Sequence, residues 1–281
     1  MMIDTKAYEA QLVDIIRRSK AVISDIKPSD WVEQNMVMGK PYPGPFRYDR
    51  TPYTREVVDR LAPDDPARVV AVMKGAQIGF SAGVIYAGSC WIIRNNPGNT
   101  YITVGAPDLV EKAMEKLDIA INNSGLRHMI RASVQRIRNT KSGDTNNKKE
   151  FPGGYITVAA AGNHKAWRQV DLPYGFIDDF ESVRKASKES GDTRKLIEQR
   201  FAASADTYKL FLVSTPELKE SSNIYPAYLL GDQRKYNVPC PCCGELITLE
   251  WSVVNGDITG GITWKVDDLG RVVKKSVGYI C

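Results

Sequence analysis

Residues 68–81 read RVVAVMKGAQIGFS, and this stretch decides the fold. Its first half is rich in apolar and β-branched residues, as in a buried strand, and it ends at Lys74. A short segment with small residues follows, and the sequence from about Ser81 to Arg94 then predicts a helix. A strand, a tight turn and a helix in this order begin an α/β unit.

The same alternation continues to about residue 214, so at least five strands are expected. This order predicts an α/β fold with a mainly parallel sheet and helices on both of its faces. The further elements are the strands TYITV (100–104), YITVAAA (155–161), YGFI (174–177) and KLFLVS (209–214), and a helix from about Pro107 to Asn123.

Before this region, residues 1–50 are expected to form a helical arm and a Pro-rich linker. A second helix of the arm is expected to start at Asp30, where Glu33 can complete a capping box. The apolar face of its first helix is formed by Tyr8, Leu12, Ile15 and Ile16. After the linker, a helix is expected from about Thr54 to Leu61.

Two other segments differ from the α/β pattern. The run from Asn139 to Lys149 has almost no apolar residue, which predicts a mobile surface loop between two strands. After Tyr236 the sequence becomes Gly-rich with short strands, which indicates a separate small segment.

Composition limits the function only weakly. The 281 residues are 43% hydrophobic, enough to bury a core, and the net charge of +5 leans only slightly toward a nucleic-acid partner. No run has the apolar length of a membrane span, and the N-terminus lacks the order of a signal peptide, so we expect a cytoplasmic protein without a membrane partner.

The turn after the first strand resembles a phosphate-binding loop. Backbone N–H groups at the start of a helix can surround phosphate oxygens, and the Ser81 hydroxyl can bind Mg²⁺. Against the pattern GxxxxGK[ST], Gly79 and Ser81 match, but Phe80 replaces the lysine and Lys74 replaces the first glycine. An ordinary Gly-containing turn is the alternative. The candidate loop consists of Lys74, Gly75, Ala76, Gln77, Ile78, Gly79, Phe80 and Ser81.

An apolar strand ends in carboxylates at Asp178, Asp179 and Glu181. Such a cluster can hold Mg²⁺ and orient an attacking water, with Asp178 as the metal ligand and Asp179 as the candidate base. The alternative is that Asp179 or Glu181 only caps the next helix.

Other candidates are less specific. Ser214 and Thr215 end the strand KLFLVS, and the carboxyl ends of parallel strands lie beside the ligand crevice. Arg168 precedes the acidic strand and could reach a phosphate or the DNA backbone. An ordinary turn and a surface salt bridge are the respective alternatives.

The cysteines are grouped as half of a zinc ribbon. Cys240 and Cys243 belong to the motif CPCCG, and two thiolates on one turn supply half of a tetrahedral site. Cys281 is a candidate third ligand for Zn²⁺, and reduced cysteines without metal are the alternative. Cys90 is expected to fill the core.

These motifs occur in one order with characteristic surroundings. The segments PGPFRYDRTPYTREVVDRL, VVAVMKGAQIG, FIDDFE, LFLVSTP and SNIYPAYLLGDQRKYNVPCPCCG resemble lambda-like (GpA) phage terminase large subunits over residues 28–281. The resemblance implies a P-loop NTPase fold of the additional-strand ATPase type. Its implied domains are residues 51–236 for the ATPase and residues 237–281 for a partial zinc-ribbon-like segment.

The resemblance also implies an enzyme that hydrolyses ATP with Mg²⁺ and moves double-stranded DNA into a procapsid. Implied partners are the terminase small subunit, the portal protein and further copies in a ring, in the host cytoplasm and docked on the procapsid. A C-terminal endonuclease is implied for the full-length protein.

Individual roles follow from the same resemblance. Terminases often place the basic residue of the loop at its first position, which makes Lys74 the phosphate-binding lysine. Arg168 is an implied phosphate sensor, and Tyr48 or Tyr53 could stack on the base. The family usually has Asp-Glu where this chain has Asp178-Asp179.

Two other functions share part of this pattern. A helicase would have the loop and the acidic strand, although the cysteine segment argues against it. A module that binds DNA or portal without catalysis would explain the altered loop and the Asp-Asp pair.

Overall fold

The computed structural model describes residues 26–39, 42–132, 134–135, 141–142, 145–161, 172–183, 193–218, 221–250 and 261–280. The chain divides into two compact units, Met1–Asp232 and Gln233–Cys281.

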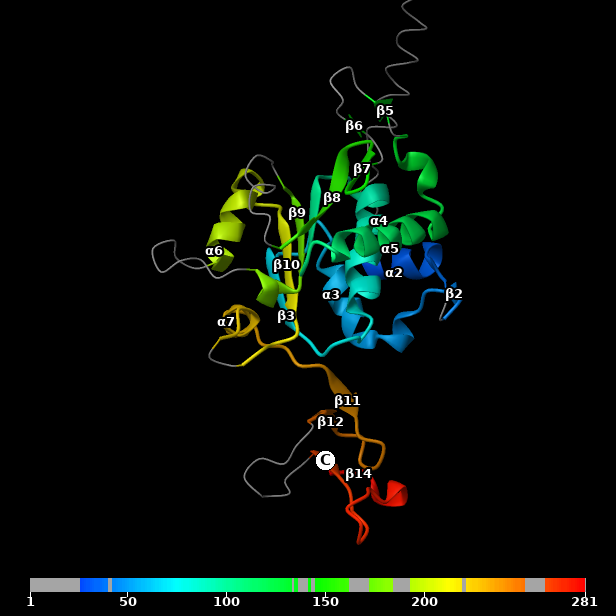
Figure 1. The fold of residues 1–281 in the computed structure, drawn as a ribbon, viewed down its shortest axis with the longest axis vertical. Helices are drawn as coiled ribbons and strands as arrows, with labels where there is room; N and C mark the ends of the chain where they lie inside the picture. Colours follow the sequence, from blue (N-terminus) through cyan, green and yellow to red (C-terminus); the bar gives the residue numbers. More distant parts are fainter. Residues whose placement is uncertain are drawn as a thin grey trace, which may run out of the picture. The chain divides into compact units, whose positions relative to one another are not determined.

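The first unit is built on one sheet of six strands, of which five are parallel (Figure 1). The predicted α/β fold with a mainly parallel sheet is thereby confirmed, and the sixth strand, β7, is antiparallel to β8. In spatial order the strands are β3 (Val69–Met73), β10 (Lys209–Ser214), β9 (Tyr174–Asp178), β4 (Thr100–Val104), β8 (Gly154–Ala160) and β7 (Lys148–Phe151).

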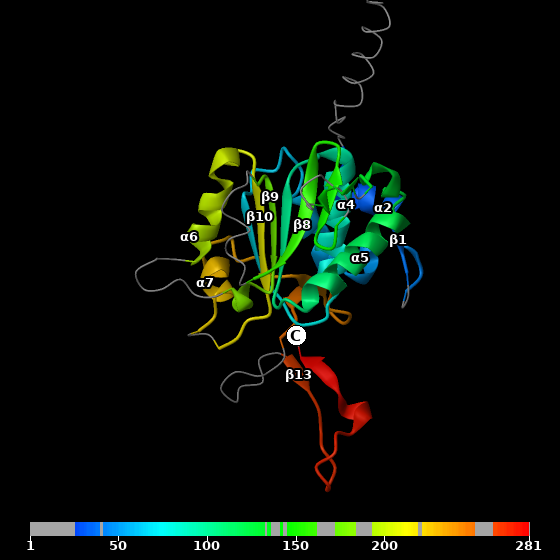
Figure 2. The same ribbon diagram turned by 45° about the horizontal axis from the view of Figure 1, so that its top comes forward.

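Helices cover both faces of this sheet, as Figures 1 and 2 show. Alternate residues of a strand point to opposite faces, so Phe211 and Val213 of β10 belong to one core while Leu210 and Leu212 belong to the other. The first core is covered by α2 (Pro28–Asn35), α3 (Arg55–Asp59), α4 (Ala87–Asn95) and α5 (Leu109–Asn123), and the second by α6 (Thr193–Glu198) and α7 (Ile224–Leu229).

The helix after the candidate loop begins where the sequence predicts, at Ser81, but in an unexpected form. Residues Ser81–Tyr86 (η3) are π-helical, and the α-helix α4 follows at Ala87. Wider π-helical turns are rare and occur often at functional sites.

Short elements complete the first unit. Two small antiparallel pairs are β1 (Val37–Met38) with β2 (Gly44–Pro45) and β5 (Val134–Gln135) with β6 (Lys141–Ser142). Short 3₁₀ helices are η1 (Tyr48–Arg50), η2 (Pro52–Thr54), η4 (Arg127–Met129), η6 (Phe180–Ser182) and η7 (Gln199–Ser204).

The helix expected at Asp30 starts earlier, at Pro28, and the predicted capping box does not form. Proline favours the first helical turn because its missing N–H is not needed there. The carboxylate of Glu33 instead accepts a hydrogen bond from the Tyr48 N–H at 2.7 Å, which fastens η1 to α2. The earlier helix of the arm, with its apolar face, lies outside the described residues.

The predicted loop over Asn139–Lys149 is wrong in part, because β6 and the start of β7 fall within it. Lys149 is buried in β7, and its ammonium group binds the Asp118 carboxylate of α5 at 2.7 Å. Lys148 lies over the ring of Tyr155, 4.2 Å from its centre. Ion pairing and stacking thus let two lysines occupy a strand that polarity alone assigns to a loop.

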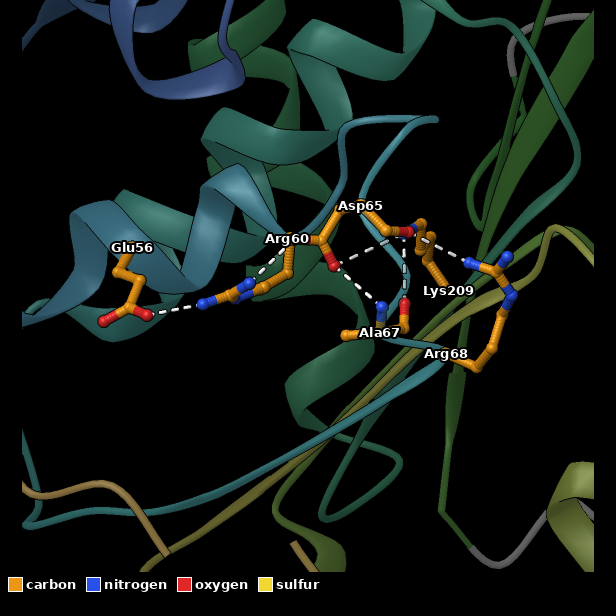
Figure 3. A network of polar contacts seen from close by, with 6 residues as sticks. All are labelled: Glu56, Arg60, Asp65, Ala67, Arg68 and Lys209. Carbon is orange, nitrogen blue, oxygen red and sulfur yellow. Dashed lines mark hydrogen bonds and ion pairs between the residues drawn. The ribbon is translucent and has the colours of Figure 1, made fainter. Parts of the chain in front are cut away.

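The amino end of β10 is fastened by a polar network around Lys209 (Figure 3). The buried Lys209 ammonium group donates to the carbonyls of Asp65 (2.6 Å) and Ala67 (3.0 Å). The Asp65 carboxylate also binds Arg60 at 2.8 Å, and Arg60 pairs with Glu56. The network joins the segment before β3 to the start of β10, so these two strands are fixed side by side.

The second unit contains two hairpins, β11 (Asn237–Pro239) with β12 (Leu246–Thr248) and β13 (Gly261–Thr263) with β14 (Gly278–Ile280). A 3₁₀ turn, η8 (Lys274–Ser276), precedes β14. In the parts of both units that the structure describes, no helix has the length and apolar character to cross a membrane.

Candidate active site

The turn between β3 and η3 forms an exposed loop with alternating backbone conformations. Gln77 (φ 55°) and Gly79 (φ 78°) are left-handed, whereas Ile78 between them is not. Backbones of alternating hand turn successive N–H groups toward one side, and this is the arrangement of anion-binding loops. Gly75, Gln77 and Gly79 are exposed, so the loop is open to a ligand at these residues.

This loop is braced by the segment before α3. The Tyr53 hydroxyl donates to the carbonyl oxygen of Ile78 at 2.6 Å. A Cβ at Gly79 would lie 3.0 Å from Thr51 Cγ2, so a larger residue would push the brace away as well as strain the backbone.

Lys74 and Phe80 occupy different environments. Phe80 is 3% exposed and packs in the first core, so its side chain has no access to a ligand and only its backbone remains available. The Lys74 N–H donates to the Ser214 carbonyl at 3.0 Å. The half-buried Lys74 side chain lies near enough to Asp178 for its charge to lower the pKa of that carboxyl.

Ser81 and Asp178 are brought together from positions 97 residues apart, and the Ser81 hydroxyl donates to Asp178 Oδ2 at 3.0 Å. Burial raises the pKa of the Asp178 carboxyl above its usual value, and the Ser81 hydrogen bond and the Lys74 charge offset part of that rise. A hydroxyl and a half-buried carboxylate form a set of oxygen donors that suits a hard cation, which would also relieve the cost of partly burying the charge.

Asp179 follows β9 in a left-handed conformation, with φ 64°. Its carboxylate accepts hydrogen bonds from Ser182 and, at 3.2 Å, from Ser214. A Cβ on Gly105, which follows β4, would lie 2.2 Å from Asp179 Oδ2. The carboxylate therefore occupies space that only a glycine at position 105 leaves open.

Glu181 is engaged with the start of α7. Its carboxylate accepts hydrogen bonds from the Ser222 hydroxyl, from the Asn223 N–H at 2.6 Å and from the Ile224 N–H at 3.2 Å. This is the helix-capping role that the sequence left open for Glu181, although the capped helix lies far along the chain.

Ser214 is buried at the end of β10 and connects the two acidic residues. Its hydroxyl donates to Asp179 Oδ1 and accepts from the Glu181 N–H, both at 3.2 Å. Thr215, the next residue, is exposed. The predicted pair is thus divided between a buried connector and a surface residue.

The two candidate tyrosines differ in accessibility. Tyr48 is 1% exposed, and its hydroxyl donates to the Gly83 carbonyl at 2.8 Å, so it is unsuited to stacking on a base. Tyr53 is half-buried beside the loop and keeps its place as the candidate. Thr54 is buried and closed off from a ligand.

The remaining predicted residues lie elsewhere. Arg168 and Cys281 are outside the described residues. The turn from Cys240 to Gly244 is tight, with the Gly244 N–H bonded to the Cys240 carbonyl at 2.9 Å. Cys240 is buried and Cys243 exposed. Within the described ranges, no group of three or more His, Cys, Asp or Glu side chains is placed to hold a metal, so the zinc prediction gains no support.

Sequence reasoning missed Gly105, Ser182, Ser222 and Asn223. Gly105 carried a usable signal, because it directly follows the buried strand TYITV and so lies at the carboxyl edge where ligand sites form. The other three had no comparable signal, since their partners depend on how β9, β10 and α7 meet.

Comparison with known proteins places these features in context. The family described as "Phage terminase large subunit gpA, ATPase domain" matches residues 40–281. No curated protein sequence matches the chain.

Two solved structures are similar in fold. The large terminase of bacteriophage HK97 is 12% identical with a TM-score of 0.53, and the match covers 73% of this chain and 41% of that one. This chain thus spans less than half of the HK97 protein. The large terminase ATPase domain of Thermus phage P74-26 is 13% identical with a TM-score of 0.48, and the match covers 79% of this chain and 82% of that domain.

Proposed function

The chain belongs to the family of phage terminase large subunit gpA ATPase domains, and from this premise we propose that it hydrolyses Mg²⁺-ATP to move double-stranded DNA into a procapsid. The observation that carries the proposal is the hydrogen bond between Ser81, at the end of the loop, and Asp178, at the end of β9. It joins a phosphate-binding element to an acidic element, and both are needed for phosphoryl transfer.

The phosphates would be held by the backbone N–H groups from Gly75 to Ser81 and by the Lys74 ammonium group. Two features support this assignment: the left-handed positions at Gln77 and Gly79, and the burial of Phe80, which leaves Lys74 as the basic residue of the loop. Tyr53, which braces the loop through Ile78, is the candidate contact for the base.

Ser81 and Asp178 would hold Mg²⁺. Their oxygens fit this ion because Mg²⁺ takes one or two protein oxygens together with phosphate oxygens and waters. When bound, Mg²⁺ neutralises charge that develops on the phosphate oxygens.

Asp179 would orient the attacking water. Its carboxylate follows the metal-binding residue directly, and Ser182 and Ser214 fix its direction. A carboxylate that accepts a hydrogen bond from water holds that water in line and takes up its proton as the bond to phosphorus forms.

The position of β10 supports an additional-strand ATPase fold, because β10 lies between the loop strand β3 and the acidic strand β9. Ser214, at its end, contacts the backbone of Lys74 and the carboxylate of Asp179. Hydrolysis that alters either contact would shift the end of β10, and the exposed Thr215 next to it would move at the surface.

Activities of the whole protein are part of the same proposal. The family leads us to propose the small subunit, the portal and neighbouring copies in a ring as partners, together with docking on the procapsid in the host cytoplasm. An endonuclease in the full-length protein and a zinc ion at Cys240, Cys243 and Cys281 complete the proposal.

Steady-state phosphate release from ATP, with and without Mg²⁺ and double-stranded DNA, tests this function. Lys74→Ala and Asp178→Ala are each expected to lower kcat/KM by about 100-fold or more, because Lys74 would compensate the phosphate charge directly and Asp178 would hold the Mg²⁺ that does so. Lys112→Ala and Asp206→Ala change exposed residues that make none of the site contacts described above, and they serve as charge-matched controls.

Equal turnover in all four variants would contradict the assignment of the site. ATP binding without turnover in the native chain would favour a binding module, and strand separation without any procapsid would favour a helicase.

A further inference from the structure

Helix α7 begins without an acidic residue in its own first turn. Its first N–H groups are nevertheless bonded: Asn223 and Ile224 donate to Glu181, and Tyr225 donates to the Ser222 hydroxyl at 3.1 Å. The Ser222 hydroxyl in turn donates to Glu181. A single carboxylate, 42 residues from Asn223 in the sequence, therefore satisfies the start of the helix and complements its dipole.

The same carboxylate belongs to the acidic turn of the active site. From Asp179, a continuous path runs through the Ser214 hydroxyl to the Glu181 N–H, and from the Glu181 carboxylate to Asn223. A second tie is formed by the Asn223 amide group, which donates to the Val183 carbonyl at 3.0 Å. The turn after β9 is thus bonded to the start of α7 by two ties, one through the Glu181 carboxylate and one through the Asn223 amide group.

We infer that Glu181 is a positioning residue that couples Asp179 to the N-terminus of α7 through a clamp made of Ser222 and Asn223. The role of Asp179 in this inference rests on the proposed function. Glu181 is a poorer candidate than Asp179 for the water-activating base because its carboxylate accepts three hydrogen bonds, two of them from backbone N–H groups at the start of α7, whereas Asp179 accepts only from the hydroxyls of Ser182 and Ser214. A change at Asp179 or Ser214 on nucleotide binding would reach α7 through this clamp.

Amide hydrogen exchange across residues 222–229, together with steady-state ATP hydrolysis, tests the inference on the full chain. Glu181→Gln replaces one acceptor oxygen by an NH₂ group and removes the charge, so exchange in the first turn of α7 should accelerate by about tenfold. We expect kcat to fall by about tenfold at nearly unchanged KM, since Asp179 loses its support but not its chemistry.

Three variants complete the comparison. Glu217→Gln removes an exposed carboxylate just beyond β10 and should match the native chain in both measurements. Ser222→Ala should also accelerate exchange in the first turn of α7, but by a smaller factor than Glu181→Gln. Asp179→Asn should abolish turnover and leave exchange in α7 of the nucleotide-free chain at the native rate, because its amide oxygen can still accept the Ser214 hydrogen bond and the clamp remains intact.

Unchanged exchange in Glu181→Gln would overturn the clamp, and fast exchange with native kcat would overturn the coupling to Asp179. A native chain without ATPase activity would contradict the proposed function instead. In that case slower exchange in α7 on binding a non-hydrolysable Mg²⁺-ATP analogue, lost in Glu181→Gln, would support the inference, and its absence from the native chain would refute it.

Discussion

Asp178 carries its charge where burial disfavours it. Because burial raises the pKa of this carboxyl in the folded chain, the ionised form destabilises the metal-free protein once the pH exceeds that raised pKa. Below the ordinary aspartate pKa both the folded and the unfolded chain are protonated at this position, so the destabilisation is absent there. The ionised carboxylate of this residue thus lowers the free energy of unfolding of the metal-free chain, and it provides a negative charge that a cation can bind.

Asp178→Asn should therefore raise the stability of the metal-free chain at pH 7 while turnover is lost. The amide oxygen can still accept the Ser81 hydrogen bond, so the change removes mainly the half-buried charge. Urea denaturation without Mg²⁺ measures the effect, and Asp206→Asn is the exposed control. Lower stability in Asp178→Asn than in the control would show that the carboxylate is stabilised in the folded chain without a metal.

Gly105 is the other residue on which the site depends closely. A Cβ at this position meets the Asp179 carboxylate, whose direction is already fixed by Ser182 and Ser214. Gly105→Ala should displace the carboxylate and lower kcat by about 100-fold, since small misplacements of a catalytic group have effects of this size. Nucleotide affinity should stay near the native value because the loop is untouched.

Gly39→Ala is the matched control, since a Cβ there meets nothing within 4 Å. Isothermal titration of a non-hydrolysable nucleotide, with single-turnover hydrolysis, separates binding from chemistry. Native kcat in Gly105→Ala would mean that Asp179 can act from another position.

At the scale of elements, β10 has hydrogen-bonded polar groups at both ends. Ser214 connects to the acidic turn, and Lys209 is held in the network of Figure 3. Burial lowers the pKa of Lys209 to about 8, with Asp65 opposing and Arg68 reinforcing that shift. The strand between these ends is fully buried, so it is fixed by its termini as well as by its apolar residues.

Lys209 gives the folded chain a distinctive pH dependence. The unfolded chain keeps this proton up to about pH 10.5 and the folded chain only up to about pH 8, so the unfolded state binds more protons between these values. The contribution of Lys209 should make the free energy of unfolding rise by about 1 to 2 kcal/mol across this interval and stay constant below it.

Comparison with Lys209→Met isolates this contribution, because other groups that titrate above pH 8 are common to both chains. Urea denaturation from pH 7 to pH 10.5 should show the native chain gaining stability relative to the variant. Parallel curves would indicate that Lys209 stays protonated throughout, held by Asp65.

The strands with continuous apolar runs could be predicted because burial on both faces selects such runs. The strand β7 could not, since Lys149 is buried with its ammonium group paired to Asp118, which comes from a helix far away in the sequence. The π-helical turn at Ser81 was not predicted either, because its residue types do not distinguish a π-helix from an α-helix. Local pattern thus fails where a long-range partner decides the structure.

The candidate site divides in the same way. Lys74, Ser81 and Asp178 lie at ends of predicted strands or helices, so the order of these elements along the chain was enough to predict that the three residues meet. Glu181 was ambiguous between base and cap, and only the packing of α7 beside β10 shows which donors its carboxylate meets. Position along a strand is encoded locally, whereas hydrogen-bond partners across elements are not.

At the scale of the whole molecule, every contact that builds the candidate site lies in the first compact unit. The loop, the acidic turn and the start of α7 fall between Tyr53 and Ile224. All residues of the two apolar cores that support them come before residue 232. Cys240 of the second unit is buried but belongs to neither core. The second unit is formed mainly by two short hairpins with largely exposed side chains. Folding of the site should therefore be independent of the second unit.

A chain that ends at Asp232 should then bind Mg²⁺-nucleotide with a Kd within about threefold of the full chain, because none of the contacts that build the candidate site comes from a residue after 232. Its basal hydrolysis should persist and be lost in the same chain with Lys74→Ala. Loss of binding with an intact thermal transition would show that the second unit contributes to the site. Loss of the transition itself would show that the first unit needs the second to fold. Retained hydrolysis without stimulation by DNA would assign DNA coupling to residues after 232.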